Sequence, residues 1–238
     1  MRPTTVIFDM DGLLIDSEPL WEEAAGEILA GFNVRLTPEQ YHQHTGLRTP
    51  EFLAWWFTYF GISAEYIGET EKNLVDLVIR KVSARPRFQP GVPHILQFFK
   101  ERGYRMGLAS SSPMNLIDTV EELGQLGQYI EVKTSAEHLP YGKPHPQVYL
   151  ECAHQLGVSP LECVAFEDSF NGLISAKAAR MTCVVVPAPD QQDQPRWNAS
   201  DLKLSTLEDF NEATLEALPF GNLTPKPFKN VKGVAFPG

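Results

Sequence analysis

The chain has 238 residues, 43% of them hydrophobic and 21% charged, and it carries a formal net charge of -10 at pH 7. This composition supports a sizeable core and excludes a largely disordered chain, and the length allows one large domain or a core with an insertion. The acidic balance argues against a nucleic-acid or membrane-surface binder, because nucleic-acid phosphates and anionic lipids attract a basic face. One or two cations would still suffice to bind one small phosphate.

In chain order, the first predicted element is a short apolar strand at residues 4–8, which ends at the polar Asp9. Residues 15–88 are helical in pattern and contain no convincing strand. Helical patterns then separate three more apolar runs, at residues 104–109, 163–166 and 182–186. Short apolar strands that alternate with helices are typical of βαβ units around a buried parallel sheet.

The predicted fold is therefore α/β, with a doubly wound, Rossmann-like parallel sheet and an inserted all-α domain. We expect the core at residues 1–14 and 89–220 and the insertion at residues 15–88. The last stretch, residues 221–238, has no periodicity and is rich in proline, glycine and lysine. It is predicted to be an extended or disordered tail.

The cysteines and the apolar segments bear on the location of the protein. Cys152, Cys163 and Cys183 form an odd set without metal-type spacing, which indicates reduced thiols. The apolar segment near the N-terminus, residues 6–8, is too short for a signal peptide and is followed at once by the charged Asp9. The most apolar stretch, residues 52–57, is far shorter than the ~20 residues of a membrane-spanning helix. We expect a cytoplasmic protein without a membrane or nucleic-acid partner, either a monomer or a weak homodimer.

Polar residues follow the predicted strands at the edge where a parallel α/β sheet binds its ligands. The first strand leads into Asp9 and Asp11, and the second into Ser110 and its neighbours. The strand at 163–166 leads into Glu167 and Asp168, and a loop before a helix carries Lys143. Carboxylates, hydroxyls and one lysine are thus expected to meet at one edge of the sheet.

These residue types together indicate phosphoryl transfer. Asp9, Asp168 and Glu167 offer hard oxygen ligands, for which Mg²⁺ is the natural partner. The Ser110 hydroxyl and the Ser111 backbone N–H are candidates to hold phosphoryl oxygens. A carboxylate beside a metal and a lysine is suited to attack phosphorus and form an aspartyl-phosphate.

The order of these residues resembles a known family, the haloacid dehalogenase-like (HAD) hydrolases. Residues 8–18, FDMDGLLIDSE, are similar to the opening motif of that family, and Ser110, Lys143 and the pair Glu167-Asp168 match its second, third and fourth motifs in order. The resemblance implies Asp9 as nucleophile and Asp11 as general acid and base, with Ser110 and Lys143 as phosphate ligands. It also implies Mg²⁺ held by Asp9, the backbone carbonyl of Asp11 and Asp168, with Glu167 close by.

The insertion is similar to the helical cap of the subfamily that holds β-phosphoglucomutase and sugar-phosphate phosphatases. Residues 15–21, 108–113 and 139–149 are most similar to bacterial hexitol phosphatases, also called 2-deoxyglucose-6-phosphate phosphatases. The resemblance implies a small phosphorylated sugar or sugar alcohol as the substrate. In the segment 45–48, TGLR, Arg48 is expected to contact the substrate from the cap.

Two other functions share the four motifs, a phosphomutase and a non-catalytic sugar-phosphate sensor. The mutase pattern has a cap histidine a few residues after the equivalent of Asp16, whereas no histidine precedes His42 here. Pro113 and Met114 also stand where the mutase has Lys-Asn to hold a second phosphate. A complete set of catalytic residues weighs against a sensor, so hydrolysis is the favoured prediction. Whether Glu167 ligates the metal or orients its neighbours stays open.

Overall fold

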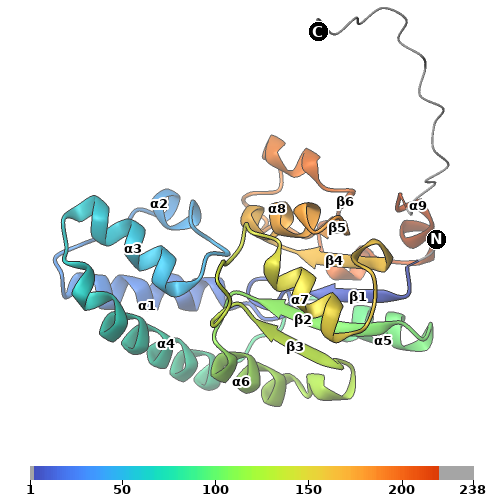
Figure 1. Ribbon diagram of the computed structural model, residues 1–238, viewed down its shortest axis with the longest axis horizontal. Helices are drawn as coiled ribbons and strands as arrows, with labels where there is room; N and C mark the ends of the chain where they lie inside the picture. Colours follow the sequence, from blue (N-terminus) through green and yellow to red (C-terminus); the bar gives the residue numbers. More distant parts are fainter. Residues whose placement is uncertain (1–2, 220–238) are drawn as a thin grey trace, which may run out of the picture.

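The computed structural model describes residues 3–219 (Figure 1). A single sheet of six parallel strands has the order β3-β2-β1-β4-β5-β6. The strands are β1 (Thr5–Phe8), β2 (Arg105–Ser110), β3 (Val132–Ser135), β4 (Cys163–Glu167), β5 (Thr182–Val185) and β6 (Leu202–Lys203). The strand order reverses between β1 and β4, which lie side by side at the centre. The predicted tail at 221–238 lies outside the described residues.

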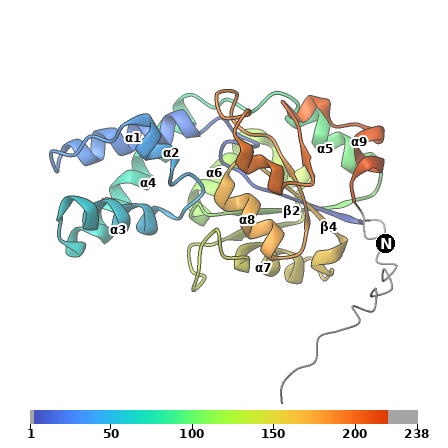
Figure 2. The ribbon, with the colours of Figure 1, turned by 90° about the horizontal axis from the view of Figure 1, so that it is seen from above.

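Helices cover both faces of the sheet, because successive side chains of each strand point to opposite faces (Figure 2). In β1, Val6 and Phe8 pack on one face and Ile7 on the other, and all three are fully buried. The first face is covered by α5 (Val92–Glu101), α6 (Met114–Gly124) and α9 (Glu212–Ala217). The second is covered by α7 (Gln147–Gln155) and α8 (Phe170–Ala178). The doubly wound parallel fold predicted from the sequence is confirmed.

Four α-helices and one 3-10 helix (Ala64–Tyr66) lie between β1 and α5, and the α-helices project to one side of the sheet in Figure 1. They are α1 (Glu18–Ala30), α2 (Pro38–His42), α3 (Thr49–Phe60) and α4 (Ile67–Ala84). α1 and α3 pack on α4, which also contacts α6 of the sheet layer. We call these four helices and their loops the helical cap. None of the helices in the described part of the chain is both long and apolar enough to cross a membrane.

Two short connections join the helical cap to the sheet, and they run side by side. Ile15 pairs with Phe88 in an antiparallel bridge. The Asp16 N–H donates to the Arg87 carbonyl at 2.8 Å, and the Gln89 N–H donates to the Leu14 carbonyl at 3.0 Å. Residues 14/15 and 88/89 lie in these connections, and the division of the chain into two domains at these positions stays a prediction.

Two strands were not expected from the sequence. β3 reads Val-Lys-Thr-Ser and carries one aliphatic side chain, so it lacks the apolar run that marks a buried strand. It lies at one edge of the sheet, where polar residues are tolerated. β6 has two residues and lies at the other edge. Both pair with a neighbouring strand by backbone hydrogen bonds, which leave little trace in the side-chain pattern.

Candidate active site

The site lies where the strand order reverses, at the carboxyl ends of the central strands. Asp9 follows β1 directly, and its backbone N–H donates to the Phe166 carbonyl of β4 at 3.0 Å. Ser110 is the last residue of β2, and Asp168 follows β4. Crevices at this reversal point are the usual ligand sites of open parallel sheets. The topology therefore brings together residues that are far apart in the sequence.

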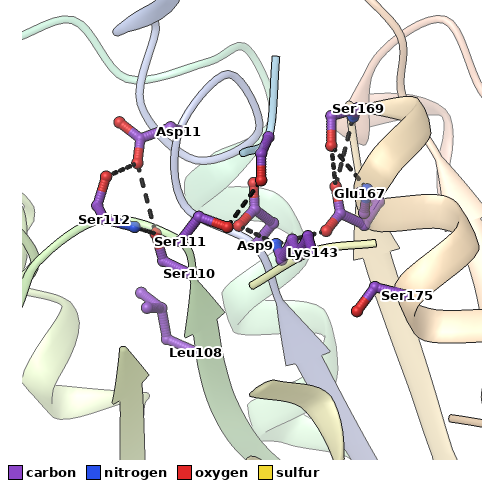
Figure 3. Close-up of polar contacts among 12 residues, drawn as sticks. Asp9, Asp11, Leu108, Ser110, Ser111, Ser112, Lys143, Glu167, Ser169 and Ser175 are labelled. Atoms are coloured by element: carbon purple, nitrogen blue, oxygen red, sulfur yellow. Dashed lines mark hydrogen bonds and ion pairs between the residues drawn. The ribbon is translucent and has the colours of Figure 1, made fainter. Parts of the chain in front are cut away.

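A buried lysine is at the centre of the site (Figure 3). The Lys143 ammonium donates to Oδ1 of Asp9 and to Oε1 of Glu167, both at 2.6 Å. The Lys143 side chain is 1% exposed and that of Glu167 is 0% exposed. Burial by itself lowers the pKa of Lys143, but the two carboxylates more than offset it, so the pKa lies above its ordinary value. Lys143 is therefore a fixed positive charge.

Glu167 binds the lysine and accepts further hydrogen bonds from two neighbouring residues. Its Oε1 also accepts a 2.6 Å hydrogen bond from the Tyr149 hydroxyl. Its Oε2 accepts from the Ser169 hydroxyl at 3.2 Å and from the Ser169 backbone N–H at 3.4 Å. A side chain at Gly172 would overlap the Glu167 carboxylate, so glycine is required there. This arrangement orients Lys143 toward Asp9.

Asp11 lies across the site from Lys143. Its Oδ1 accepts hydrogen bonds from the Ser17 hydroxyl at 2.7 Å and from the Trp21 indole N–H at 2.9 Å. Its Oδ2 accepts from the Ser112 hydroxyl at 2.7 Å (Figure 3). Ser17 is the N-cap residue of α1, yet its hydroxyl makes no capping bond. The first turn of the helical cap is thus bound to a carboxylate of the sheet edge.

Asp9 and two further carboxyl groups, of Glu18 and Asp168, lie close together in this buried region. Burial, and then the charge of Glu167, raises the pKa of Asp9 to about 7. Burial, followed by Asp11 and Asp9, raises the pKa of Glu18 to about 8. Burial, followed by Asp9 and Glu167, raises the pKa of Asp168 well above its ordinary value. One buried oxygen of Glu18 and one of Asp168 have no hydrogen-bond partner among the described residues.

This excess of negative charge fits a bound divalent cation. Carboxylate oxygens of Asp9, Glu167 and Asp168 lie within 4.8 Å of one another. All the donors are hard oxygens, the type that Mg²⁺ prefers. A side chain at Gly12, whose φ is +77°, would collide with the Asp168 carboxylate. Glycine at this turn therefore keeps the space beside the carboxylates open.

A cavity extends from these residues into the helical cap. Its floor comes from the sheet edge and includes Asp9, Asp11, Lys143 and the serines that follow β2. Its roof comes from the helical cap and is mostly apolar, with the Glu18 carboxyl group and a few hydroxyl and ring nitrogen groups. The roof residues are Glu18, Trp21, Ala25, Tyr41, His44, Thr45, Gly46, Leu47, Thr49, Phe52 and Leu74.

The loop of the helical cap at residues 45–48 is held against the sheet layer. The Ser111 hydroxyl donates to the Gly46 carbonyl at 2.7 Å, and the Asn171 amide donates to the Thr45 carbonyl at 2.9 Å. The Arg48 guanidinium donates to the carbonyls of Ala136 at 3.2 Å and Leu139 at 2.7 Å. It also pairs with Glu51 of its own helix at 2.5 Å. Arg48 therefore bridges the two parts of the chain and is not among the cavity-lining residues.

Seven of the eight predicted site residues gather in one region: Asp9, Asp11, Ser110, Ser111, Lys143, Glu167 and Asp168. Arg48 lies beside it. The sequence reasoning gave no role to Ser17, Glu18, Trp21, Ser112 or Tyr149, all of which contact or border the site. Ser17 and Trp21 are four residues apart at a helix start, a spacing that places both on one face. That spacing was the available signal for this pair.

Comparison with known proteins identifies the family. A model of haloacid dehalogenase-like hydrolases matches residues 3–180, so the chain belongs to this hydrolase family. Hexitol phosphatase B of Escherichia coli (strain K12) is 43% identical over 215 residues, which cover 88% of this chain and 95% of that protein. A phosphorylated carbohydrates phosphatase of Thermotoga maritima is 31% identical over 176 residues, which cover 73% of this chain and 80% of that protein. The chain is accordingly a phosphatase of the family.

Solved structures share the fold. CbbY from Rhodobacter sphaeroides, in complex with phosphate, has a TM-score of 0.79 at 22% identity, covering 90% of this chain and 100% of that one. β-Phosphoglucomutase from Clostridium difficile has a TM-score of 0.78 at 20% identity, covering 91% and 96%. At these sequence identities the similarity establishes the fold. The reaction has to be inferred from the residues of the site.

The buried lysine predicts a large loss of stability on substitution. Lys143→Met leaves the Asp9 and Glu167 carboxylates without a counter-charge, and we expect a cost of about 3–5 kcal/mol in the free energy of unfolding by urea. The matched control is Lys133→Met, because Lys133 also contacts two carboxylates but is 27% exposed; its cost should be about 0–1 kcal/mol. Adding Glu167→Gln to Lys143→Met should restore part of the loss. Equal losses of unfolding free energy in Lys143→Met and Lys133→Met would contradict the view that Lys143 is a buried counter-charge.

Glu18 predicts a pH dependence of stability in metal-free protein. Its pKa rises from an ordinary 4.5 to about 8 on folding, so the folded state holds a proton that the unfolded state releases. Stability is therefore lost as pH rises between these values and stays low above pH 8. We therefore compare the Tm of Glu18→Gln with that of wild type, both in EDTA. The difference, variant minus wild type, should be at least about 3 °C larger at pH 8.5 than at pH 5.

The exposed Glu216 provides the control for this comparison. Glu216→Gln should leave the difference in Tm from wild type the same at both pH values. If Glu18→Gln also shows a difference that does not change with pH, Glu18 is not a carboxyl group with a raised pKa.

Proposed function

We propose that the chain is a Mg²⁺-dependent phosphatase of small phosphorylated sugars or sugar alcohols that works through an aspartyl-phosphate on Asp9. The observation that carries this proposal is the contact of Asp9 with the buried Lys143 at the floor of the cavity. Lys143 occupies Oδ1 of Asp9, which leaves Oδ2 to attack phosphorus. The similarity to hexitol phosphatase B supports the substrate class.

The substrate phosphate is proposed to lie over Asp9, held by Ser110, the Ser111 backbone N–H and Lys143. Asp9 and Asp168 would hold Mg²⁺, together with the Asp11 backbone carbonyl. When bound there, Mg²⁺ neutralises charge on the phosphoryl oxygens and on the nucleophile. The hydrogen bonds that Glu167 already accepts from Lys143, Tyr149 and Ser169 favour a role in orienting the lysine over direct metal ligation.

The reaction then proceeds in two steps. Asp9 forms a bond to phosphorus while the bond from phosphorus to the sugar oxygen breaks, and Asp11 gives a proton to that oxygen. Water next loses a proton to Asp11 and attacks phosphorus, the bond to Asp9 breaks, and phosphate is released. Asp11 recovers its proton in the second step, so the cycle closes.

The charge of the cavity favours a monophosphate and hence hydrolysis over a mutase reaction. Lys143 is the sole lysine or arginine among the described residues that line the cavity. A bisphosphate, as a phosphomutase needs, would place its second phosphate under the mostly apolar roof without such a partner. We propose that Arg48 acts on substrate binding indirectly, since its contacts hold the loop that forms part of the roof.

Location within the cell is proposed on separate grounds. Cys152, Cys163 and Cys183 are all buried free thiols, which is usual in a reducing compartment. This supports a cytoplasmic protein.

Phosphate release from purified protein tests the function. We expect Mg²⁺-dependent release from hexose or hexitol monophosphates, and none in EDTA. Asp9→Asn should abolish turnover while keeping the wild-type Tm to within a few degrees, whereas the exposed control Asp193→Asn should be fully active. Conversion of glucose 1-phosphate to another hexose phosphate without phosphate release would indicate a mutase instead. Activity near wild type in Asp9→Asn would refute the nucleophile.

A further inference from the structure

The hydrogen bonds of Asp11 divide its two oxygens into different environments. Oδ1 accepts from Ser17 at 2.7 Å and from Trp21 at 2.9 Å. Oδ2 accepts from Ser112 at 2.7 Å and has Ser110 only at 3.5 Å. A carboxylate oxygen has two lone pairs, so Oδ1 is fully used, whereas Oδ2 keeps one acceptor position on the side of Ser110.

Trp21 is the most restrictive of these partners. An indole N–H donates and cannot accept, whereas a hydroxyl can reverse its role. The Trp21 bond therefore requires an oxygen with a free lone pair at Oδ1, and it fixes the rotation of the carboxylate. The indole comes from α1 of the helical cap and also lines the cavity. One side chain thus contacts both the acid/base group and the space for the leaving group.

Building on the proposed function, we propose that Trp21 is a positioning residue for proton transfer to the leaving group. Its N–H holds Asp11 so that Oδ2, facing Ser110 and the phosphate position, carries the exchanged proton. In the first step the bond from phosphorus to the sugar oxygen breaks as that oxygen takes the proton from Oδ2. The new bond forms between phosphorus and Asp9, and water returns the proton to Oδ2 in the second step.

Leaving groups of different basicity separate this role from a structural one. An alkoxide such as that of a hexitol must be protonated as it leaves, whereas p-nitrophenolate leaves without a proton. The ratio kcat/KM reports the steps up to the first irreversible one, here the transfer to Asp9. A residue that positions the acid should therefore matter for a hexitol phosphate and little for p-nitrophenyl phosphate.

The test is Trp21→Phe, which keeps an aromatic ring and removes the N–H. We expect kcat/KM for a hexitol 6-phosphate to fall at least about tenfold, which is part of the 10²–10⁴-fold that general acid–base catalysis contributes. For p-nitrophenyl phosphate we expect a fall of less than about threefold. The matched control is Trp56→Phe, because the Trp56 indole N–H is also buried in the helical cap but has no partner among the described residues. In that control, kcat/KM should be unchanged for both substrates.

A second variant, Ser17→Ala, tests the proposal even if Trp21→Phe does not fold. Ser17→Ala removes the other donor to Oδ1 and leaves the Trp21 ring in place, so it should show the same selective loss. Equal losses for both substrates, or no loss, in folded Trp21→Phe and Ser17→Ala would overturn the proposal. If the wild type releases phosphate from neither substrate, the proposed function itself fails, an outcome distinct from the loss of selectivity.

Discussion

The rest of the site depends on one buried cation between two carboxylates. An ammonium group that is 1% exposed would be costly to bury without partners. Asp9 and Glu167 supply those partners from the ends of two adjacent strands, β1 and β4. Asp9, the proposed nucleophile, is thereby fixed by the same interaction that stabilises the buried lysine. The proposed catalytic geometry and the local stability therefore depend on the same ion pairs.

A second constraint is the excess of carboxylate groups around that lysine. One lysine cannot balance Asp9, Asp11, Glu18, Glu167 and Asp168. Burial, and then the neighbouring carboxylates, raises the pKa values of Asp9, Glu18 and Asp168. A divalent cation and a substrate phosphate bring opposite charges, so each favours the binding of the other. The excess of carboxylates suits a divalent cation, and the charge of that cation would in turn favour the binding of a phosphate.

The sequence predicts the parts of this arrangement that depend on strand ends. Apolar runs mark β1, β2, β4 and β5, and those of β1, β2 and β4 end in polar residues. A parallel sheet brings these strand ends to one edge, so Asp9, Ser110 and Asp168 could be found. The edge strands β3 and β6 could not, because they pair through backbone groups. The spacing of Ser17 and Trp21 shows only that they share a helix face, and the segment 45–48 only that Arg48 lies in a loop. Their contacts with Asp11 and with the sheet layer depend on how the helical cap packs on the sheet, which the sequence pattern does not record.

The fold is shared with mutases and phosphatases, so the reaction must be decided by individual residues. The feature that favours hydrolysis of a monophosphate is the sparse positive charge under the roof. Acid-quenching the enzyme during turnover of a hexitol phosphate, followed by peptide mass analysis, tests the central claim most directly. We predict the added mass of one phosphoryl group on the peptide that contains Asp9. A phosphoryl group trapped on another residue, or none during rapid turnover with a demonstrably stable quench, would contradict it.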